Sequence, residues 1–456
     1  MKIRPSEFKV EDYLGKTFEC ACGRSHFTEL GRVLIKSGAL KDVPDLIKQL
    51  GYRRPMVICG PNSKKAAGAA VNELLTDSGF KTVFHVLDSS DLVPDEAALG
   101  ELMMAHEINV DIILAVGTGT INDICKFMSF HMGIPYAVIA TAPSMDGFAS
   151  NGAALITQNL KTTYSAHVPL AIAADIDVLK NAPIHMITAG LGDILGKYIC
   201  LTDWKISNII NGEYYCPQIV KMVEHSLNKV TENAEKVLRR DEEAVAAIME
   251  ALIITGIAMS FVGNSRPASG SEHHISHYWE MKFQLEGKKP VLHGTKVGIG
   301  TVLTCFIYNQ IKDMEPDFEK ARKHAADFNM EIWEKNITRT FMQAAPGVIE
   351  LERKAGKNSA VKHEERIKII EEKWGEIAQT VKTSVPAAES IIRMLESLNA
   401  PAFPQDIGID SNTVYDSIIV AKEVRDRYTL LQLLWDLGIE EEMAGRLVGW
   451  LDSRGK

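Results

Sequence analysis

The sequence predicts an α/β N-terminal domain built on a parallel sheet and an all-α C-terminal domain. Between residues 55 and 141, short apolar runs alternate with helical segments. Nearly continuous apolar strands of this kind are typical of a parallel sheet covered on both faces. After Pro183 most segments have helical periodicity and few strand signals. We therefore predict one domain over residues 1–180 and a second over residues 181–456.

Length and composition exclude several classes of protein. The 456 residues suffice for two or three domains, and 46% of them are hydrophobic. A formal net charge of −9 argues against nucleic-acid binding. The chain has no run of 18 apolar residues, and its N-terminus lacks the apolar core of a signal peptide, so we expect no membrane association. Seven scattered cysteines favour a reducing compartment, and we predict a cytoplasmic protein.

Four predicted strands each lead into a turn and then a helix or loop. These strands cover residues 55–59, 81–88, 111–117 and 135–141. The first ends in Gly60-Pro61-Asn62-Ser63, and the second precedes a helix over 95–106. The third runs into Gly117–Asp123, which opens the helix that carries Lys126, and the fourth ends in Ala142–Gly147. Ligands of parallel sheets bind at such carboxyl ends of strands.

The turn Gly117-Thr118-Gly119-Thr120 has the clearest binding signature of these. Glycines after a strand let backbone N–H groups approach a pyrophosphate, and the following helix N-terminus offers partial positive charge. The turn is not the GxGxxG fingerprint, because Asn122 occupies the third glycine position. A purely steric need for glycine in a tight turn is the alternative.

Further elements are predicted with less specific roles. Short strands between Ser150 and Asp175 (AALITQ and TYSAHVPLAIAAD) are expected to form a hairpin over the sheet edge. The Lys-rich stretch 352–374 is predicted to present solvated helix faces. The remaining predicted helices cover residues 186–200, 216–238, 241–262, 296–312 and 416–436.

The stretch Ser265–Gly300 is the candidate centre of the chemistry. Four of the chain's 13 histidines lie in it: His273, His274, His277 and His293. If residues 272–284 are helical, His273 and His277 share a face, with Glu280 one turn further on. Histidines of an amphipathic helix that hydrogen-bond in a core are the alternative. The clustering beside Ser, Arg and Gly favours a divalent-metal site that needs about three protein ligands.

Two other segments have competing interpretations. Asp193 follows a Gly-Leu-Gly sequence at a predicted helix start, where it is either a third metal ligand or a helix cap. Cys20-Ala-Cys22-Gly-Arg-Ser-His26 is suggestive of zinc, but no second ligand pair follows closely. We therefore predict a structural strand and turn for residues 20–26.

Five motifs together resemble one family. The segments GTGTINDICK, TAPSMDGFAS, AGLGDILGK, SRPASGSEHHISHYWEM and LHGTKVGIG are similar to those of the sn-glycerol-1-phosphate dehydrogenases, most closely the bacterial branch. That family belongs to a superfamily with glycerol dehydrogenase, iron-containing alcohol dehydrogenases and dehydroquinate synthase. The resemblance covers most of the chain and implies a dehydroquinate synthase-like fold, with a Rossmann-like dinucleotide-binding domain and a helical metal- and substrate-binding domain.

The resemblance also implies roles for individual residues. Asp193, His273 and His293 would bind one divalent ion, for which Zn, Ni and Fe all suit the ligand set. His277 and Asp146 would contact the substrate, and Asp193 would lie beside it. NAD or NADP would bind residues at the ends of three strands, namely Asn62, Gly117, Thr118, Gly119, Thr120, Ile121, Thr141, Ala142, Pro143, Ser144 and Ser150.

Two departures separate the chain from its relatives. Lys197 stands where the iron-type alcohol dehydrogenases have a further histidine, and Asp193 with Gly196 replaces the glutamate and lysine of dehydroquinate synthase. No acidic residue directly ends the 55–59 strand, so the choice between NAD and NADP stays open.

The implied reaction is the reversible reduction of dihydroxyacetone phosphate to sn-glycerol 1-phosphate, a step of phospholipid metabolism, by a homodimer. His277 is the candidate proton carrier. Arg266 is favoured over Lys197 and Lys296 for the substrate phosphate, with internal salt bridges as the alternative for all three. The rival functions are a glycerol or other polyol dehydrogenase and a non-catalytic metabolite-binding protein.

Overall fold

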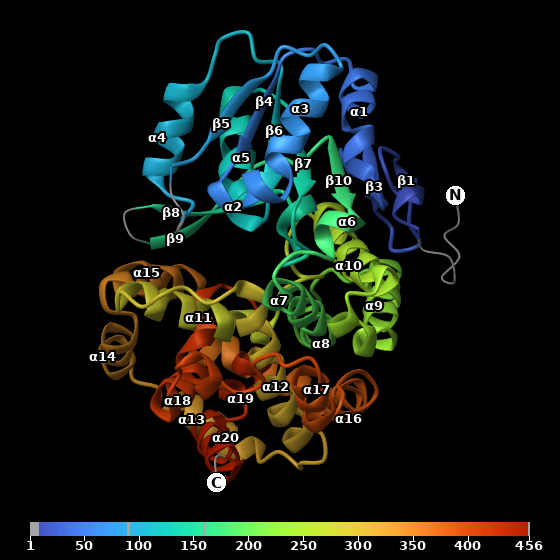
Figure 1. Ribbon diagram of the computed structural model, residues 1–456. Coiled ribbons are helices and arrows are strands. Elements are labelled where there is room, and N and C mark those ends of the chain that lie inside the picture. The colour runs from blue at the N-terminus through green and yellow to red at the C-terminus, as the bar shows by residue number, and fades with distance from the viewer. Residues whose placement is uncertain (1–8, 89–91, 158–159, 455–456) are drawn as a thin grey trace. The chain divides into compact units, whose positions relative to one another are not determined.

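The structure is a computed structural model that describes residues 9–88, 92–157 and 160–454 (Figure 1). The chain forms two compact units. The first, called the sheet unit, contains residues 1–194 and 217–265. The second, called the helical unit, contains residues 195–216 and 266–456. The domain boundary expected at residue 180 stays a prediction.

A six-stranded parallel sheet organises the sheet unit, in the order β3-β10-β7-β6-β4-β5. Its strands are β3 Arg32–Lys36, β4 Pro55–Cys59, β5 Val83–Val86, β6 Ile112–Gly117, β7 Tyr136–Ala140 and β10 Ala171–Asp175. The four strands predicted between residues 55 and 141 are all present. The α/β class and the parallel sheet are thereby confirmed.

The interpretation of residues 150–175 as one hairpin is partly wrong. β8 (Gly152–Thr157) and β9 (Leu160–Ser165) do form an antiparallel pair, while residues 158–159 lie outside the described part of the chain. Ala171–Asp175 instead enters the main sheet, where it pairs with β7 on one side and β3 on the other. All five residues of β10 are buried, which the covered centre of a parallel sheet requires.

In the sheet unit, apolar side chains are buried on both faces of the strands. Alternate strand residues such as Val57 and Leu114 pack with the helices α1 (Val43–Gln49) and α3 (Ala69–Asp77) in one apolar cluster. The intervening residues Met56, Ile58 and Ile113 are also fully buried. This two-sided burial explains why these strands are continuously apolar in the sequence.

The helices of the sheet unit include two from the later part of the chain. α9 (Pro217–Glu232) and α10 (Glu242–Val262) pack against each other, and α10 also contacts the turn Asp146–Ala149. The α-helices of this unit are α1 Val43–Gln49, α2 Pro61–Ser63, α3 Ala69–Asp77, α4 Glu96–Ala105, α5 Gly119–Met132, α6 Ile176–Leu179, α7 Ile184–Leu195 except its last residue, α9 Pro217–Glu232 and α10 Glu242–Val262.

The helical unit contains only helices and their connections among its described residues. Its α-helices are α8 Lys197–Asn211, α11 Ser271–Leu285, α12 His293–Ile311, α13 Phe318–Ala326, α14 Met330–Phe341, α15 Ala345–Ala355, α16 Ala360–Ser384, α17 Ala388–Ser397, α18 Ser411–Val420, α19 Leu430–Asp436 and α20 Glu440–Arg454.

Four predicted helices are interrupted. The 216–238 segment divides at Asn233 into α9 and a 3-10 helix over Ala234–Arg239. The 186–200 segment divides at Gly196 into α7 and α8. The 352–374 segment divides after α15, where Gly356 has a φ of 57°. The 416–436 segment divides after α18, because a short 3-10 turn over Ala421–Val424 places Lys422 and Glu423 in a buried ion pair. Helical periodicity alone does not reveal such local breaks.

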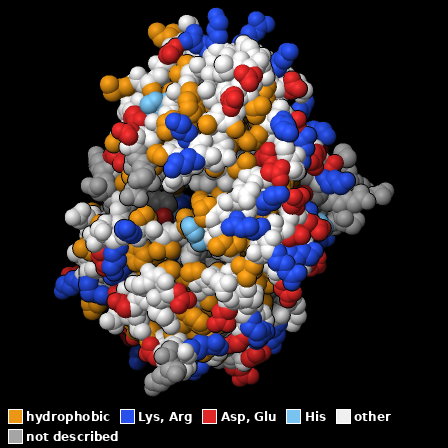
Figure 2. Space-filling model, in the orientation of Figure 1, with side chains coloured by type: hydrophobic (Ala, Val, Ile, Leu, Met, Phe, Trp, Pro, Cys, Tyr) orange, Lys and Arg blue, Asp and Glu red, His pale blue; other side chains and the backbone are white. Residues whose placement is uncertain are grey.

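Two apolar helical stretches have the length and composition of a membrane span, residues 184–211 and α10. In each, 78% of the most apolar window is buried inside the protein, as expected for core helices. On the face drawn in Figure 2, basic and acidic side chains are interspersed. This pattern agrees with the acidic net charge and offers no basic stripe on that face for a nucleic acid.

Candidate active site

Three histidines of the helical unit face one another. His273 and His277 lie on α11, which confirms the helix predicted over 272–284, and His293 is the first residue of α12. The ring centroids are 6.0 Å apart for His273 and His277, 5.1 Å for His273 and His293, and 5.5 Å for His277 and His293. The i,i+4 spacing and the start of α12 thus bring together the side chains that the sequence singled out.

Carboxylates fix two of these rings. His273 Nδ1 lies 2.6 Å from Glu272 Oε1, and His277 Nδ1 lies 3.3 Å from Glu280 Oε2. A carboxylate accepts, so each Nδ1 carries the proton and each Nε2 is the nitrogen that can coordinate or exchange a proton. Lys296 lies 3.2 Å from the other oxygen of Glu280. Carboxylate–histidine pairs of this kind are the usual support of a metal ligand.

Two overlapping sets of side chains have metal-ligand geometry. Asp193, His273 and His293 offer ligand atoms that all lie within 4.8 Å of one another, and so do His277, Glu280 and His293. The first set matches the ligands that the resemblance implies. One carboxylate and two imidazoles suit a divalent ion and leave positions for a substrate. The donor chemistry therefore fits the metal that the family implies.

Asp193 does not lie at a helix start, and the capping interpretation is wrong. The residue occupies the last turn of α7 and is fully buried. The preceding glycines lie within α7 rather than in a turn. A Cβ on Gly190 would lie 1.8 Å from the carbonyl oxygen of Pro143. Glycine thus allows α7 to approach the loop after β7. Asp193 Oδ2 accepts the backbone N–H of Asp146 in this loop at 3.0 Å.

Hydrogen bonds from Lys126 hold the loop after β7 in place. The sequence suggested no role for this residue. Its buried ammonium donates to Gly147 O at 2.7 Å, Ser150 Oγ at 3.0 Å and Gly152 O at 3.0 Å. Burial lowers the pKa of Lys126 to about 8, against the opposing effect of Asp123 and Asp146. The hydrogen bonds position the loop that carries Asp146 and Ser150.

The expected cofactor residues lie at the carboxyl ends of three adjacent parallel strands. β4 leads to Asn62 in α2, β6 to the start of α5, and β7 to the loop that begins at Thr141. This placement joins turns that are far apart in the sequence. The segments are Asn62, Gly117–Ile121, Thr141–Ser144 and Ser150.

The turn after β6 has the close packing that a pyrophosphate cradle needs. Gly117 ends β6, and a Cβ there would lie 2.7 Å from the Ile121 side chain. Thr118 is the N-cap of α5, and Gly119 is its first residue. The three atoms nearest to a Cβ on Gly119 would belong to the Met145 side chain, at 3.4–3.6 Å, and Gly119 has no positive φ. The residues present thus fit a dinucleotide, and Gly119 is open to a substitution that does not strain the backbone.

The three candidate phosphate-binding cations make internal contacts. Arg266 is buried and pairs with both oxygens of Glu213, at 2.7 and 2.5 Å, and donates to Tyr428 O at 2.8 Å. Lys197 donates to Ala268 O at 3.0 Å, and Lys296 pairs with Glu280. These contacts support the salt-bridge alternative for Arg266, and its contact with a phosphate stays a prediction.

The fourth histidine of the stretch belongs to the core. His274 is fully buried, and burial, aided by Arg427 and Arg425, lowers its pKa well below the usual value. Glu272, which contacts His273, is a candidate site residue that the sequence motifs did not single out. The only signal for it was its position directly before His273, because a supporting carboxylate has no fixed spacing from a ligand.

Comparison with known proteins defines the class first. A model of the iron-containing alcohol dehydrogenase family matches residues 34–183. A probable glycerol dehydrogenase from Sinorhizobium meliloti has a TM-score of 0.60 at 16% identity, over 92% of this chain and 98% of that chain. An iron-containing alcohol dehydrogenase from Corynebacterium glutamicum has a TM-score of 0.59 at 15% identity, over 92% and 96%. The fold is that of the iron-containing alcohol dehydrogenases.

Closer relatives give the particular family. The glycerol-1-phosphate dehydrogenase of Halalkalibacterium halodurans is 33% identical over 91% of this chain and 95% of its own length. The enzyme of the same name from Pyrococcus horikoshii is 34% identical, but over 62% of this chain and 80% of its own length. Both relatives are named as NAD(P)+ enzymes. The chain belongs to the glycerol-1-phosphate dehydrogenase family, which confirms the resemblance and the oxidoreductase class inferred from the motifs.

Proposed function

We propose that this chain catalyses the reversible NAD(P)H-linked reduction of dihydroxyacetone phosphate to sn-glycerol 1-phosphate. The observation that carries the proposal is the convergence of Asp193, His273 and His293 within 4.8 Å in a chain of this family. The ligand set is the one that the motifs imply. The substrate follows from the names of the relatives, which match more than nine-tenths of the chain in the bacterial case.

Asp193, His273 and His293 would hold the divalent ion. When bound, it supplies a Lewis acid that polarises a carbonyl oxygen. Glu272 keeps His273 in the tautomer whose Nε2 can coordinate, through the 2.6 Å contact at Nδ1. Asp193 also accepts the N–H of Asp146, so the same carboxylate that serves as ligand fixes the loop of a predicted substrate contact.

His277 would exchange the proton that the substrate oxygen gains or loses. Its Nδ1 proton is held by Glu280, so Nε2 is the exchanging atom. Lys296 lies 3.2 Å from the other oxygen of Glu280 and so helps to hold this carboxylate behind the His277 ring. Metal binding is the alternative role for His277, because His277, Glu280 and His293 form the overlapping ligand set.

The dinucleotide would bind at the ends of β4, β6 and β7 and would supply the hydride. Gly117 and Gly119 allow its pyrophosphate to approach the first turn of α5. Thr141, Ala142, Pro143 and Ser144 follow β7 at the same edge of the sheet. Lys126 holds Ser150 and the loop between them, so it positions the cofactor residues without being one of them.

The substrate distinguishes this proposal from a polyol dehydrogenase of the same fold. We expect kcat/KM for dihydroxyacetone phosphate to exceed that for dihydroxyacetone by at least about 10²-fold, because charge-assisted hydrogen bonds to phosphate are lost without it. Equal values for the two substrates would favour the glycerol or polyol alternative. A protein that binds NADH and metal but turns over neither substrate would favour the non-catalytic alternative.

The same proposal includes the localisation, the oligomeric state, the metal and the cofactor preference. We predict a cytoplasmic homodimer, and light scattering on the purified enzyme tests the oligomeric state. Metal-stripped enzyme re-supplied separately with Zn²⁺, Ni²⁺ and Fe²⁺ tests which ion supports turnover. Initial rates with NADH and NADPH decide the cofactor preference.

A further inference from the structure

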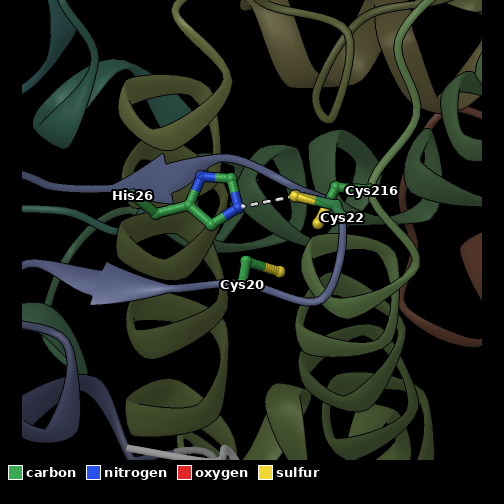
Figure 3. Close-up of side chains that lie close together, drawn as sticks. All are labelled: Cys20, Cys22, His26 and Cys216. Atoms are coloured by element: carbon green, nitrogen blue, oxygen red, sulfur yellow. Dashed lines mark hydrogen bonds between the residues drawn. The ribbon is translucent and has the colours of Figure 1, made fainter.

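A second group of metal-ligating side chains lies away from the histidines of α11. Cys20, Cys22, His26 and Cys216 offer ligand atoms that all lie within 4.8 Å of one another. Figure 3 shows the imidazole of His26 and the sulfur of Cys22 directed at each other, with Cys20 and Cys216 beside them. His26 and Cys216 are fully or almost fully buried. The proposed dehydrogenase reaction uses none of these residues.

A hydrogen bond to a backbone carbonyl fixes the orientation of the His26 ring. Its Nδ1 lies 3.2 Å from the carbonyl oxygen of Phe261, which can only accept, so Nδ1 carries the proton. The remaining nitrogen, Nε2, lies 3.4 Å from Cys22 Sγ. With the proton on Nδ1, Nε2 of the neutral ring has a lone pair for a metal. A backbone carbonyl behind a metal-binding histidine is a common support.

The sulfur–nitrogen distance agrees with a shared zinc ion. Zinc lies about 2.3 Å from a thiolate and about 2.0–2.1 Å from an imidazole nitrogen, so tetrahedral coordination separates the two ligand atoms by about 3.5 Å. The observed separation is 3.4 Å. Three cysteines and one histidine form one of the closed ligand sets of structural zinc sites, without a position for substrate.

One part of the candidate site is a very short hairpin, whose Phe18 and His26 rings pack against Phe261 of α10. Cys20 and Cys22 lie in the turn between β1 (Phe18–Glu19) and β2 (Ser25–His26), two strands of two residues each. A hairpin of this size is not stable by itself in water. Gly23, with a φ of 83°, closes the turn by donating to Cys20 O at 3.0 Å. The turn thereby presents both thiols on a short segment.

Cys216 comes from a distant part of the sequence. It directly precedes Pro217, the first residue of α9, and α9 packs against α10, which carries Phe261. The helix that follows Cys216 and the helix whose Phe261 contacts His26 therefore pack against each other. A metal bound by all four side chains would close a loop of nearly 200 residues, and such long-range links restrict the unfolded chain strongly.

From this geometry we propose that Cys20, Cys22, His26 and Cys216 bind one structural zinc ion, which fastens the N-terminal hairpin to the start of α9. Binding replaces the three thiol protons with the metal and releases them to solvent. The site is separate in residues and in chemistry from the ligand set of Asp193, His273 and His293. Its role is stability rather than turnover.

Zinc release from the wild-type holoenzyme is the first test. Titration with an organomercurial in the presence of a chromophoric chelator should release about one zinc per chain as three thiols react, because zinc in a closed site leaves only when its thiolates are modified. Thiol modification without zinc release overturns the proposal. So does a disulfide among the three cysteines in enzyme purified under reducing conditions.

Variants provide the second test. Cys216→Ser and Cys22→Ser should each contain about one zinc fewer per chain than wild type and unfold at a lower temperature, because one of four ligands is lost. Cys125→Ala, which removes a fully buried thiol elsewhere in the sheet unit, should keep the full zinc content. Equal zinc in Cys216→Ser and Cys125→Ala overturns the site.

Cobalt substitution identifies the ligands without reference to activity. Cobalt-loaded wild type should show thiolate-to-cobalt charge-transfer absorption, which Cys216→Ser weakens and His273→Ala leaves unchanged. Charge-transfer absorption that is identical in wild type and Cys216→Ser contradicts the assignment. Because the readout is thiolate-specific, loss of dehydrogenase activity on its own bears on the proposed function and not on this site.

Discussion

The two groups of metal-ligating side chains in this protein are built in different ways. The histidine group stands on two long helices, α11 and α12, and buried or half-buried carboxylates orient its rings. The cysteine group stands on a turn between two-residue strands and on the residue before α9. Helices that are stable by their own packing can hold an incomplete ligand set, whereas a short hairpin would gain stability from the metal that we propose.

The histidine group and the cysteine group also differ in the number of protein ligands. Three protein ligands leave a metal open to substrate, and four thiolate or imidazole ligands close it. We therefore expect metal loss to have opposite consequences at the two sites. At the histidine group it abolishes turnover and spares the fold, while at the cysteine group it weakens the fold. Five predictions test this comparison, in order of decreasing effect.

Asp193→Asn should have the largest effect on turnover. The variant keeps an oxygen for the N–H of Asp146 but loses the only carboxylate of the ligand set. Lewis-acid stabilisation contributes several kcal/mol, so kcat should fall on the order of 10³-fold or more. Metal analysis and steady-state kinetics check this, with the unfolding temperature as control. Full metal content with near-normal turnover would contradict the assignment.

His273→Ala and His277→Ala separate ligand from proton carrier. We expect His273→Ala to lose the metal of the histidine group. His277→Ala should retain it and lose about 10²-fold or more in kcat, the usual contribution of general acid–base catalysis. Elemental analysis of both proteins decides the matter. Equal depletion would select the alternative ligand set of His277, Glu280 and His293.

The carboxylates behind the two rings form a matched pair. Glu272→Gln should weaken metal affinity by about 10–100-fold, because it replaces the charged acceptor that orients His273 with a neutral amide. Glu280→Gln should leave metal affinity unchanged and lower kcat, because it removes the charged acceptor that orients the proposed proton carrier His277. Identical metal affinities in the two variants would show that Glu272 does not support a ligand.

Gly119→Val should raise the dissociation constant for NAD(P)H by about tenfold or more, while Gly119→Ala has a smaller effect. The branched side chain stands between the first turn of α5 and the pyrophosphate, and the turn itself is not strained because Gly119 has no positive φ. Fluorescence titration measures the affinity. Metal content of both groups should be unchanged, and unaltered cofactor affinity would place the dinucleotide elsewhere.

Lys126→Met should have the smallest effect. The loss of a buried ammonium that serves three acceptors costs about 1–3 kcal/mol of stability and raises KM for the cofactor a few-fold. Between about pH 8 and the ordinary lysine range, the unfolded chain binds a proton that folded Lys126 has lost. Lys126 therefore makes stability rise with pH in that window, and the variant should lack this rise in urea unfolding experiments.

Local patterns in the sequence determined a large part of this protein. The alternation of apolar runs and helices predicted four of the six strands of the sheet, and the i,i+4 spacing of His273 and His277 placed both on one face of a helix. The five motifs predicted the family. Each of these inferences depends on residues within a few positions of one another, where backbone periodicity fixes the geometry.

Only the tertiary structure decided which distant segments meet. β3 and β10 join the sheet through pairing across more than 100 residues, and Asp193 stands at the end of a helix that Gly190 brings against Pro143. Cys216 joins Cys20, Cys22 and His26 although nothing near it in the sequence marks it as a ligand. Such contacts depend on the path of the whole chain, because the type of a residue does not specify which distant residue will lie beside it after folding.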